Sequence, residues 1–267
     1  MPAPFRTIEI SDPTYVEPGL SFVTVKSAAL KRRADLTLFV PPGHEGEILP
    51  RVILLHGVYG SHWAWALKGG AHRVLGQLME SGQCPPMALA MPSDGLWGDG
   101  SGYLTHLEAD YAQWIVDEVP AALSAAVPSL QAGPLFISGL SMGGYGALRL
   151  GALHSDRFAG ISAHSSITDY RQMQGFVEEP LAAFRLPEGQ ITVVAEAILR
   201  NKSSLPPLRF DCGLEDTLLP YNRELHQRLE AEGVAHSYEE FPGAHSWEYW
   251  HEHLADTLRF FAGCLKG

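Results

Sequence analysis

Nowhere in its 267 residues does the sequence hold an apolar run long enough to cross a bilayer, and internal repeats and low-complexity tracts are also missing. The sequence therefore predicts no membrane-spanning helix. The first residues, MPAPFRTIEISDP, lack the basic start and apolar core of a secretory signal. We expect a soluble, cytoplasmic protein without a membrane partner.

Cysteine and positive charge are both scarce. The three cysteines, Cys84, Cys212 and Cys264, lie far apart without CxxC spacing, so neither a disulfide framework nor a zinc site is predicted. Nineteen Lys and Arg against 30 Asp and Glu give a formal net charge of −11, which disfavours nucleic acid as a partner. The HEH run at His251 lacks HExxH spacing, so we expect no metal.

Short apolar runs alternate with amphipathic segments along the whole chain. This alternation predicts the α/β class, with helices on both faces of one mainly parallel sheet. The first two strands alternate apolar and polar residues, as antiparallel edge strands do, whereas the middle strands are nearly continuously apolar. We expect one domain over residues 1–267 with about eight strands. They start at Leu20, Ala34, Arg51, Met87, Leu135, Ala159, Leu208 and His236.

Helical periodicity predicts helices over residues 70–81, 105–119, 142–154, 221–232 and 246–262. Residues 168–207 form a longer excursion than an ordinary crossover and contain a helical stretch near 191–200. Long excursions on a rigid scaffold often carry binding surfaces. The segment is either a small cap over a site or an extra surface helix, and the sequence does not choose between them.

The stretch LFISGLSMGGYGALRLG places Ser141 between Gly139 and Gly143, in the pattern G-x-S-x-G. This pattern marks a sharp strand-to-helix turn that exposes a nucleophilic serine. Side chains at the two glycine positions would collide with a neighbouring strand or helix, and the free N–H groups of the next helix favour a developing negative oxygen. A glycine-rich turn without chemistry is the alternative, but the predicted strand before and helix after Ser141 favour a nucleophile.

A serine nucleophile needs a histidine base and a carboxylate that orients it, in the chain order serine, acid, histidine for this turn. The run DCGLEDTLLP offers Asp211 at a strand end and Asp216 farther out on a loop. We prefer Asp216, since a side chain there can reach sideways, whereas Asp211 could merely cap the turn. For the base we predict His245, on the loop after the last strand, because His251 and His253 fall inside a predicted helix.

The negative oxygen formed during acyl transfer needs two N–H donors. We predict that the backbone N–H groups of Val58, in the loop HGVYG, and of Met142, after the nucleophile, supply them. Three loop aromatics, Tyr59, Trp97 and Trp247, are candidates for the wall of an acyl pocket. Ordinary packing is an equally good interpretation of these three residues.

The stretches LLHG, SGLSMGGYGAL, CGLEDTLL and PGAHSWEYW together resemble the esterase D family of α/β-hydrolases. That family includes tributyrin esterases, S-formylglutathione hydrolases, feruloyl and acetylxylan esterases, and mycolyltransferases. The resemblance runs from about Leu20 to Phe261 and implies the α/β-hydrolase fold. It also implies site residues that agree with the reasoning above: Ser141 as nucleophile, Asp216 as acid, His245 as base, and the amides of Val58 and Met142 as the oxyanion hole.

The expected activity is that of a serine carboxylic-ester hydrolase that acts on short-chain acyl esters through an acyl-enzyme, without a cofactor. Leu140 stands where S-formylglutathione hydrolases usually carry histidine, and SDGLWGDGSGY departs from the feruloyl-esterase run. The tributyrin-esterase type is therefore favoured. A thioesterase, a feruloyl or acetylxylan esterase, an acyltransferase, or a binding protein on a hydrolase scaffold are the alternatives. A small-molecule ester is the expected partner, and the sequence leaves a homo-oligomer open.

Overall fold

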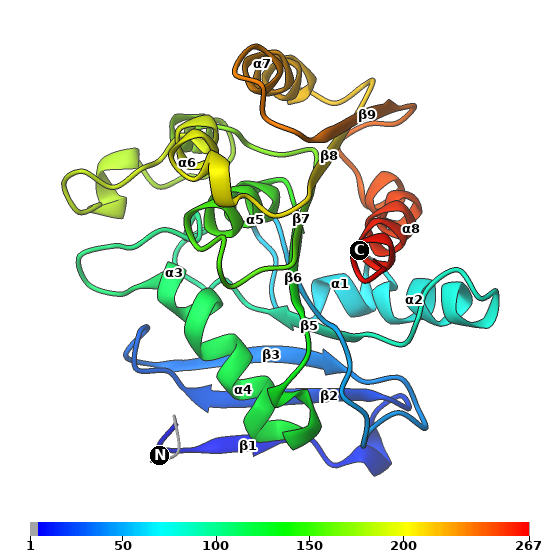
Figure 1. The fold of residues 1–267 in the computed structure, drawn as a ribbon. Coiled ribbons are helices and arrows are strands. Elements are labelled where there is room, and N and C mark those ends of the chain that lie inside the picture. The colour runs from blue at the N-terminus through cyan, green and yellow to red at the C-terminus, as the bar shows by residue number, and fades with distance from the viewer. Residues whose placement is uncertain (1–4, 267) are drawn as a thin grey trace.

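The computed structural model describes residues 5–266, and the centre of this region is a nine-stranded sheet with the order β1-β2-β3-β5-β4-β6-β7-β8-β9 (Figure 1). The first three strands are antiparallel, β3 also pairs antiparallel with β5, and the strands from β5 to β9 in this order are parallel. The strands are β1 (Ile8–Ile10), β2 (Leu20–Lys26), β3 (Arg33–Phe39), β4 (Arg51–Leu55), β5 (Ala88–Pro92), β6 (Leu135–Leu140), β7 (Gly160–His164), β8 (Leu208–Gly213) and β9 (Ser237–Phe241).

The predicted α/β class and the mainly parallel sheet are confirmed, and the eight predicted strands correspond to β2–β9. The expected count of about eight was one too low. The additional strand, β1, has three residues, Ile8–Ile10, paired with Val23–Val25. Three residues carry too little alternation to reveal a strand, because the pairing partner and not the local pattern creates it.

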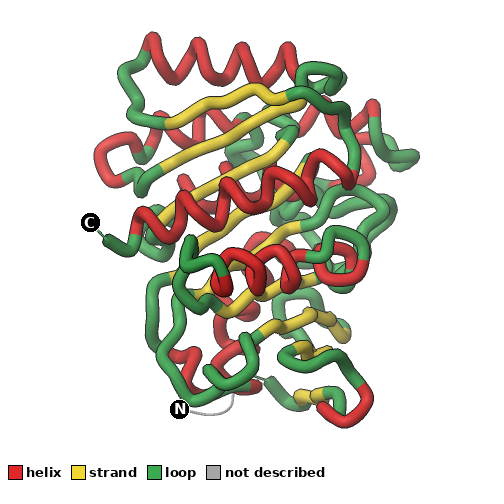
Figure 2. Tube along the Cα trace, turned by 90° about the vertical axis from the view of Figure 1, so that its right-hand side faces the viewer, coloured by secondary structure: helices red, strands yellow, loops and turns green. Residues whose placement is uncertain are grey.

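Helices cover both faces of the sheet (Figures 1 and 2). Successive residues of β4 explain why both faces need cover: Ile53 and Leu55 join the apolar cluster on one face, and Val52 and Leu54 join the cluster on the other. Helices α2 and α8 pack together on the second face, and α5 packs with α6 on the first. The helices are α1 (Ala64–Leu67), α2 (Ala71–Glu80), α3 (Tyr111–Gln113), α4 (Val119–Ala126), α5 (Met142–Leu153), α6 (Val194–Arg200), α7 (Leu219–Ala231) and α8 (Trp247–Cys264).

One predicted helix, over residues 105–119, has the wrong bounds. The helical path begins after Asp110, whose side chain accepts a hydrogen bond from the N–H of Gln113, and it continues to Ala126. A π-helical segment, Trp114–Glu118, links α3 to α4. In that segment the N–H of Val119 bonds a carbonyl five residues back, so the helical register widens just before Pro120 and the path continues past the proline.

Residues 168–207 lie over α5. Besides α6, this segment contains the 3-10 turns Tyr170–Gly175, Leu181–Phe184 and Lys202–Ser204. Two side chains of α5 hold it: the Tyr145 hydroxyl donates to the carbonyl of Thr192 at 2.8 Å, and the Arg149 Nε donates to that of Ile191 at 2.6 Å. The segment is thus fastened to the helix that follows the predicted nucleophile.

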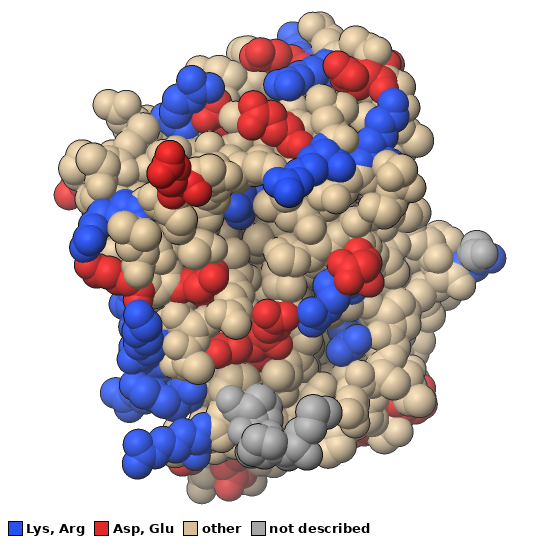
Figure 3. Space-filling view, turned by 60° about the vertical axis from the view of Figure 1, so that its left-hand side comes forward, with Lys and Arg blue, Asp and Glu red and all other residues tan. Residues whose placement is uncertain are grey.

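On the face drawn in Figure 3, acidic and basic side chains lie interspersed among uncharged residues. No helix within residues 5–266 has the length and apolar character needed to span a membrane.

Candidate active site

Ser141 stands at the junction of β6 and α5, in a backbone conformation that is costly for any residue with a side chain. Its φ is 56° and its ψ is −120°. The neighbouring glycines make this turn sterically feasible. A β-carbon at Gly139 would lie 2.3 Å from the carbonyl oxygen of Gly143, and one at Gly143 would lie 2.2 Å from that of Leu55. The strand-to-helix turn therefore holds the Ser141 hydroxyl at the carboxyl end of β6.

The structure brings Ser141, His245 and Asp216 together in one hydrogen-bonded chain. His245 Nε2 lies 3.0 Å from Ser141 Oγ, and His245 Nδ1 lies 2.8 Å from Asp216 Oδ2. The three side chains come from the loops that follow β6, β9 and β8, all at the carboxyl edge of parallel strands. The N–H of Leu218 donates to Asp216 Oδ1 at 2.8 Å and so fixes the second oxygen of that carboxylate.

The surroundings of Asp216 favour its ionised form. Burial alone would raise its pKa, but the hydrogen bond and charge of His245, the Leu218 N–H and the Ser165 hydroxyl together hold the pKa of Asp216 below its ordinary value. An ionised carboxylate at Nδ1 favours the tautomer in which Nε2 can accept a proton, and it would stabilise an imidazolium formed at this position.

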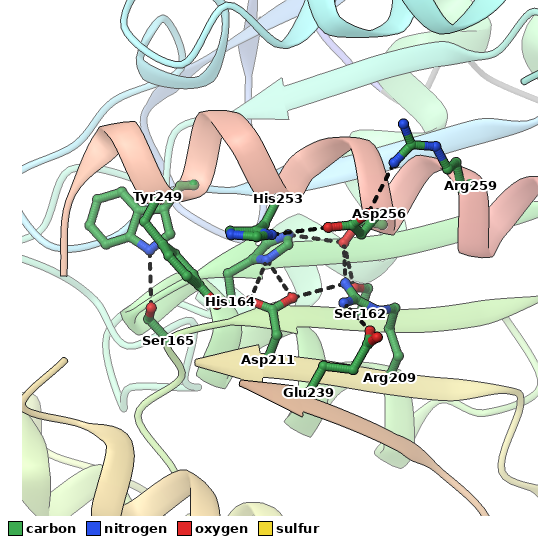
Figure 4. A network of polar contacts seen from close by, with 12 residues as sticks. Ser162, His164, Ser165, Arg209, Asp211, Glu239, Tyr249, His253, Asp256 and Arg259 are labelled. Carbon is green, nitrogen blue, oxygen red and sulfur yellow. Dashed lines mark hydrogen bonds and ion pairs between the residues drawn. The ribbon is translucent and has the colours of Figure 1, made fainter. Parts of the chain in front are cut away.

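The other candidate acid, Asp211, belongs to a separate buried network (Figure 4). Its carboxylate contacts His164 Nδ1 at 3.0 Å and Arg209 at 2.9 Å, and accepts a hydrogen bond from the Tyr249 hydroxyl at 2.8 Å. His164 Nε2 lies 2.9 Å from Thr257 Oγ1, so the network joins β7 and β8 to α8. Despite the burial, the charges of His164 and Arg209 lower the pKa of Asp211. These contacts connect the elements that carry the loops of Asp216 and His245.

The alternative histidines are occupied elsewhere. His251 Nδ1 bonds the carbonyl of Gly69 at 2.8 Å, and His253 Nδ1 lies 3.0 Å from Asp256 on the same helix. Across residues 5–266, no group of three or more His, Cys, Asp and Glu side chains is placed to hold a metal ion.

The two predicted oxyanion donors lie beside the nucleophile. Met142 is the first residue of α5, where the helix leaves N–H groups unpaired. Val58 lines the same cavity as Ser141, and a β-carbon at Gly57 would lie only 3.2 Å from the Ser141 β-carbon. In the part of the chain that the structure describes, the N–H groups of Val58 and Met142 have no hydrogen-bond partner. Neither N–H is therefore committed to an acceptor within these residues.

His56 is a supporting residue that the sequence reasoning missed. Its Nε2 accepts the N–H of Asp94 at 3.0 Å, so its Nδ1 carries the proton and donates to the carbonyl of Gly57 at 2.6 Å. The Tyr103 hydroxyl donates to the carbonyl of His56 at 2.9 Å. These bonds fix the loop that carries Val58. The signal was the histidine immediately before the loop glycine in LLHG.

An aromatic cavity of about 370 Å³ opens above Ser141 and His245. Two predicted pocket residues, Tyr59 and Trp247, line it. Trp97 does not, because its ring packs against His106 and Phe184 with centroids 4.8 and 4.6 Å away. The cavity also has aromatic lining residues that the sequence reasoning did not identify: Trp63, Phe176 and Trp250.

The family described as "Putative esterase" matches residues 27–261. The chain belongs to this esterase family. An acetyl esterase from Caldicellulosiruptor saccharolyticus is 28% identical over 237 residues, which cover 82% of this chain and 85% of that protein. As a member of the family, this esterase is a serine carboxylic-ester hydrolase, and that prediction is confirmed.

Solved structures of related shape confirm the fold of the esterase. A ferulic acid esterase superposes with a TM-score of 0.80 at 24% identity, covering 97% of this chain and 99% of that one. An S-formylglutathione hydrolase from Agrobacterium tumefaciens superposes with a TM-score of 0.74 at 19% identity, covering 98% and 99%. Because both identities are below 25%, these superpositions show that the chain shares the α/β-hydrolase fold and nothing more specific.

Proposed function

We propose that this esterase hydrolyses short-chain acyl esters of small molecules with Ser141 as nucleophile, His245 as general base and acid, and Asp216 as the group that orients His245. The hydrogen-bonded chain from Ser141 Oγ through His245 to Asp216 carries the proposal. The free N–H groups of Val58 and Met142 support it, because a donor of this kind contributes about 3 kcal/mol to the transition state.

The chemistry proceeds in two halves. Ser141 Oγ bonds to the carbonyl carbon while its proton passes to His245 Nε2, and the carbonyl oxygen becomes an oxyanion between the Val58 and Met142 N–H groups. The bond to the leaving oxygen then breaks, and His245 returns the proton to the departing alcohol. A water molecule repeats the sequence on the acyl-enzyme: it loses a proton to His245, bonds to the acyl carbon and releases the acid and Ser141.

Residues 168–207 serve, in this proposal, as a small cap of a single domain that spans residues 1–267. Phe176 is the supporting observation, since it comes from this segment and lines the cavity with its ring centroid 6.1 Å from that of His245. The location we propose is cytoplasmic. Its support is that Cys84, Cys212 and Cys264 are all free thiols, as is usual in a reducing compartment.

The test is hydrolysis of p-nitrophenyl esters from acetate to octanoate, with S-formylglutathione as a separate substrate. We expect turnover that is highest on the shorter chains and at least about 10³-fold lower in Ser141→Ala. Ser124→Ala, a change on α4 remote from the site, is the matched control and should retain wild-type rates. Undiminished hydrolysis by folded Ser141→Ala would overturn the proposal.

A further inference from the structure

Lys68 brings a positive charge to the wall of the catalytic cavity. It follows α1, is exposed, and lines the cavity with Ser141 and His245. Its Nζ lies 5.6 Å from the centroid of the Trp247 ring, within the range of a cation–π interaction. The indole face gives the flexible lysine a preferred position at the edge of the cavity.

The aromatic contacts continue from Lys68 to the catalytic histidine. The ring centroids of Trp247 and Trp250 are 5.4 Å apart, and the edge-on contact of Trp250 with His245 has a centroid distance of 4.9 Å. Trp247 also packs edge-on against the buried Trp65 at 5.6 Å. The wall between Lys68 and His245 is therefore built of packed rings.

No carboxylate neutralises Lys68 within the cavity. The residues that line it include no Asp or Glu, and among residues 5–266 Lys68 has no ion-pair partner within 4.0 Å. Asp216 is buried behind His245, to which it is paired. Glu248, outside the lining, interacts with the charge of Lys68: its pKa is lowered mainly by a hydrogen bond from Ser246 and in smaller part by the charge of Lys68. A chain with a net charge of −11 thus presents a cation at its catalytic cavity.

We propose that Lys68 is a specificity-determining residue that favours ester substrates carrying a carboxylate away from the scissile bond. The inference rests on the proposed function of the same site. The apolar part of such a substrate would lie along the aromatic rings, and its carboxylate would pair with the Lys68 ammonium. Trp63, Phe176 and Trp247 provide the aromatic surface for this arrangement.

An exposed ion pair of this kind changes an equilibrium by about twofold to fivefold. The experiment therefore compares kcat/KM for two matched pairs of esters, in which one member carries the carboxylate and the other its methyl ester. Mono-p-nitrophenyl adipate and its methyl ester place the carboxylate on the acyl side. Acetylated 3-hydroxybenzoate and its methyl ester place it on the alcohol side.

For Lys68→Gln we expect kcat/KM on the carboxylate member of one pair to fall about twofold to fivefold, with the neutral member unchanged. Lys68→Glu should lower kcat/KM on the carboxylate member further, and Lys68→Arg should restore it to about the wild-type value. Glu248→Gln should leave the preference for the carboxylate member equal or raise it. Lys26→Gln, on β2 and outside the cavity lining, should leave that preference equal. The wild-type preference should also weaken at high salt, where exposed charges are screened.

Equal effects of Lys68→Gln on both members of both pairs, or no effect on any, would overturn the inference. The pair that responds identifies the side of the ester on which the carboxylate binds. Failure of the underlying function is distinguishable from this result. In that case the wild-type protein would turn over neither neutral ester, or Ser141→Ala would retain the activity.

Discussion

Gly143, at the start of α5, touches Leu55, at the end of β4: a β-carbon on Gly143 would lie 2.2 Å from the Leu55 carbonyl oxygen. Close approach of this helix and strand brings the nucleophile loop against the loop that begins with His56. The Leu55 contact is with backbone, which cannot rotate away as the end of a side chain would. A glycine at residue 143 is thus a requirement for bringing together Ser141, the proposed nucleophile, and Val58 and Met142, the proposed oxyanion donors.

Gly143→Ala should therefore reduce both stability and activity. We expect a loss of about 1–3 kcal/mol in the free energy of unfolding from the forced displacement, measured by urea denaturation, together with a lower kcat. Gly76→Ala is the matched control, since a β-carbon at Gly76 on α2 meets nothing within 4 Å. That substitution should stabilise the protein by about 0.5–1 kcal/mol, the usual gain for alanine over glycine in a helix. Equal effects at both positions would show that the contact between residue 143 and Leu55 does not require glycine.

Asp216→Asn should leave the fold nearly intact and remove most of the activity. An amide at residue 216 no longer stabilises the imidazolium and can favour the wrong tautomer of His245, which in serine hydrolases costs kcat about 10⁴-fold. The measurement is kcat on a short p-nitrophenyl ester, with circular dichroism as the check on folding. A decrease of less than about tenfold would assign the acid role to another group.

Asp211→Asn, unlike Asp216→Asn, should mainly lower the stability of the fold and should leave substrate binding unchanged. Removing this carboxylate leaves Arg209 and His164 without their buried counter-charge, so we expect a loss of about 3–5 kcal/mol in stability. Any residual activity should keep the wild-type KM, since Asp211 lies outside the cavity lining. Thermal unfolding and steady-state kinetics on the same preparation separate the two effects.

The stability difference between wild type and Asp211→Asn should become smaller at low pH. The charges of His164 and Arg209 overcome the effect of burial and lower the pKa of Asp211 in the folded state. Its contribution to stability is therefore present above the unfolded pKa, which is about 3.9, and is lost as the pH falls through the lower folded pKa. Urea unfolding at pH 7, 4.5 and 3 should show the stability gap between wild type and Asp211→Asn narrowing only at the lowest pH.

His56→Phe should impair turnover more than substrate binding. The substitution removes the hydrogen bonds to Gly57 and Asp94 and so frees the loop of Val58. Loss of one oxyanion donor costs about 10²–10³ in kcat, and a displaced donor should cost part of that. His253→Phe is the control, because His253 packs against Phe241 and Tyr249 and is not among the residues that line the cavity. A rise in KM with unchanged kcat would speak against a positioning role for His56.

The sequence predicts those features whose cause is local. Buried parallel strands are continuous apolar runs, and a nucleophile turn needs glycines on both sides, so the sheet and Ser141 can be identified from short stretches. Asp216 and His245 follow because the serine chemistry requires their residue types on loops after later strands. Their hydrogen-bonded arrangement with Ser141 comes from the structure.

Features that depend on distant partners could not be predicted. The three residues of β1 form a strand only because β2 pairs with them. The sequence places Trp97 on a loop and so makes it a candidate pocket residue. Its ring instead packs against Phe184, which comes from a segment far along the chain. For the same reason nothing local indicated that Phe176 or Lys68 would line the cavity.

Trapping the acyl-enzyme tests most directly whether Ser141 is the nucleophile. Rapid acid quenching of the esterase with p-nitrophenyl butyrate, followed by peptide mapping by mass spectrometry, locates the covalent acyl group. We predict a butyryl group on the peptide that contains Ser141, formed with a burst of p-nitrophenolate and absent from Ser141→Ala. Steady turnover with an acyl group on another residue, or retained turnover in Ser141→Ala, would contradict the role of Ser141 as nucleophile.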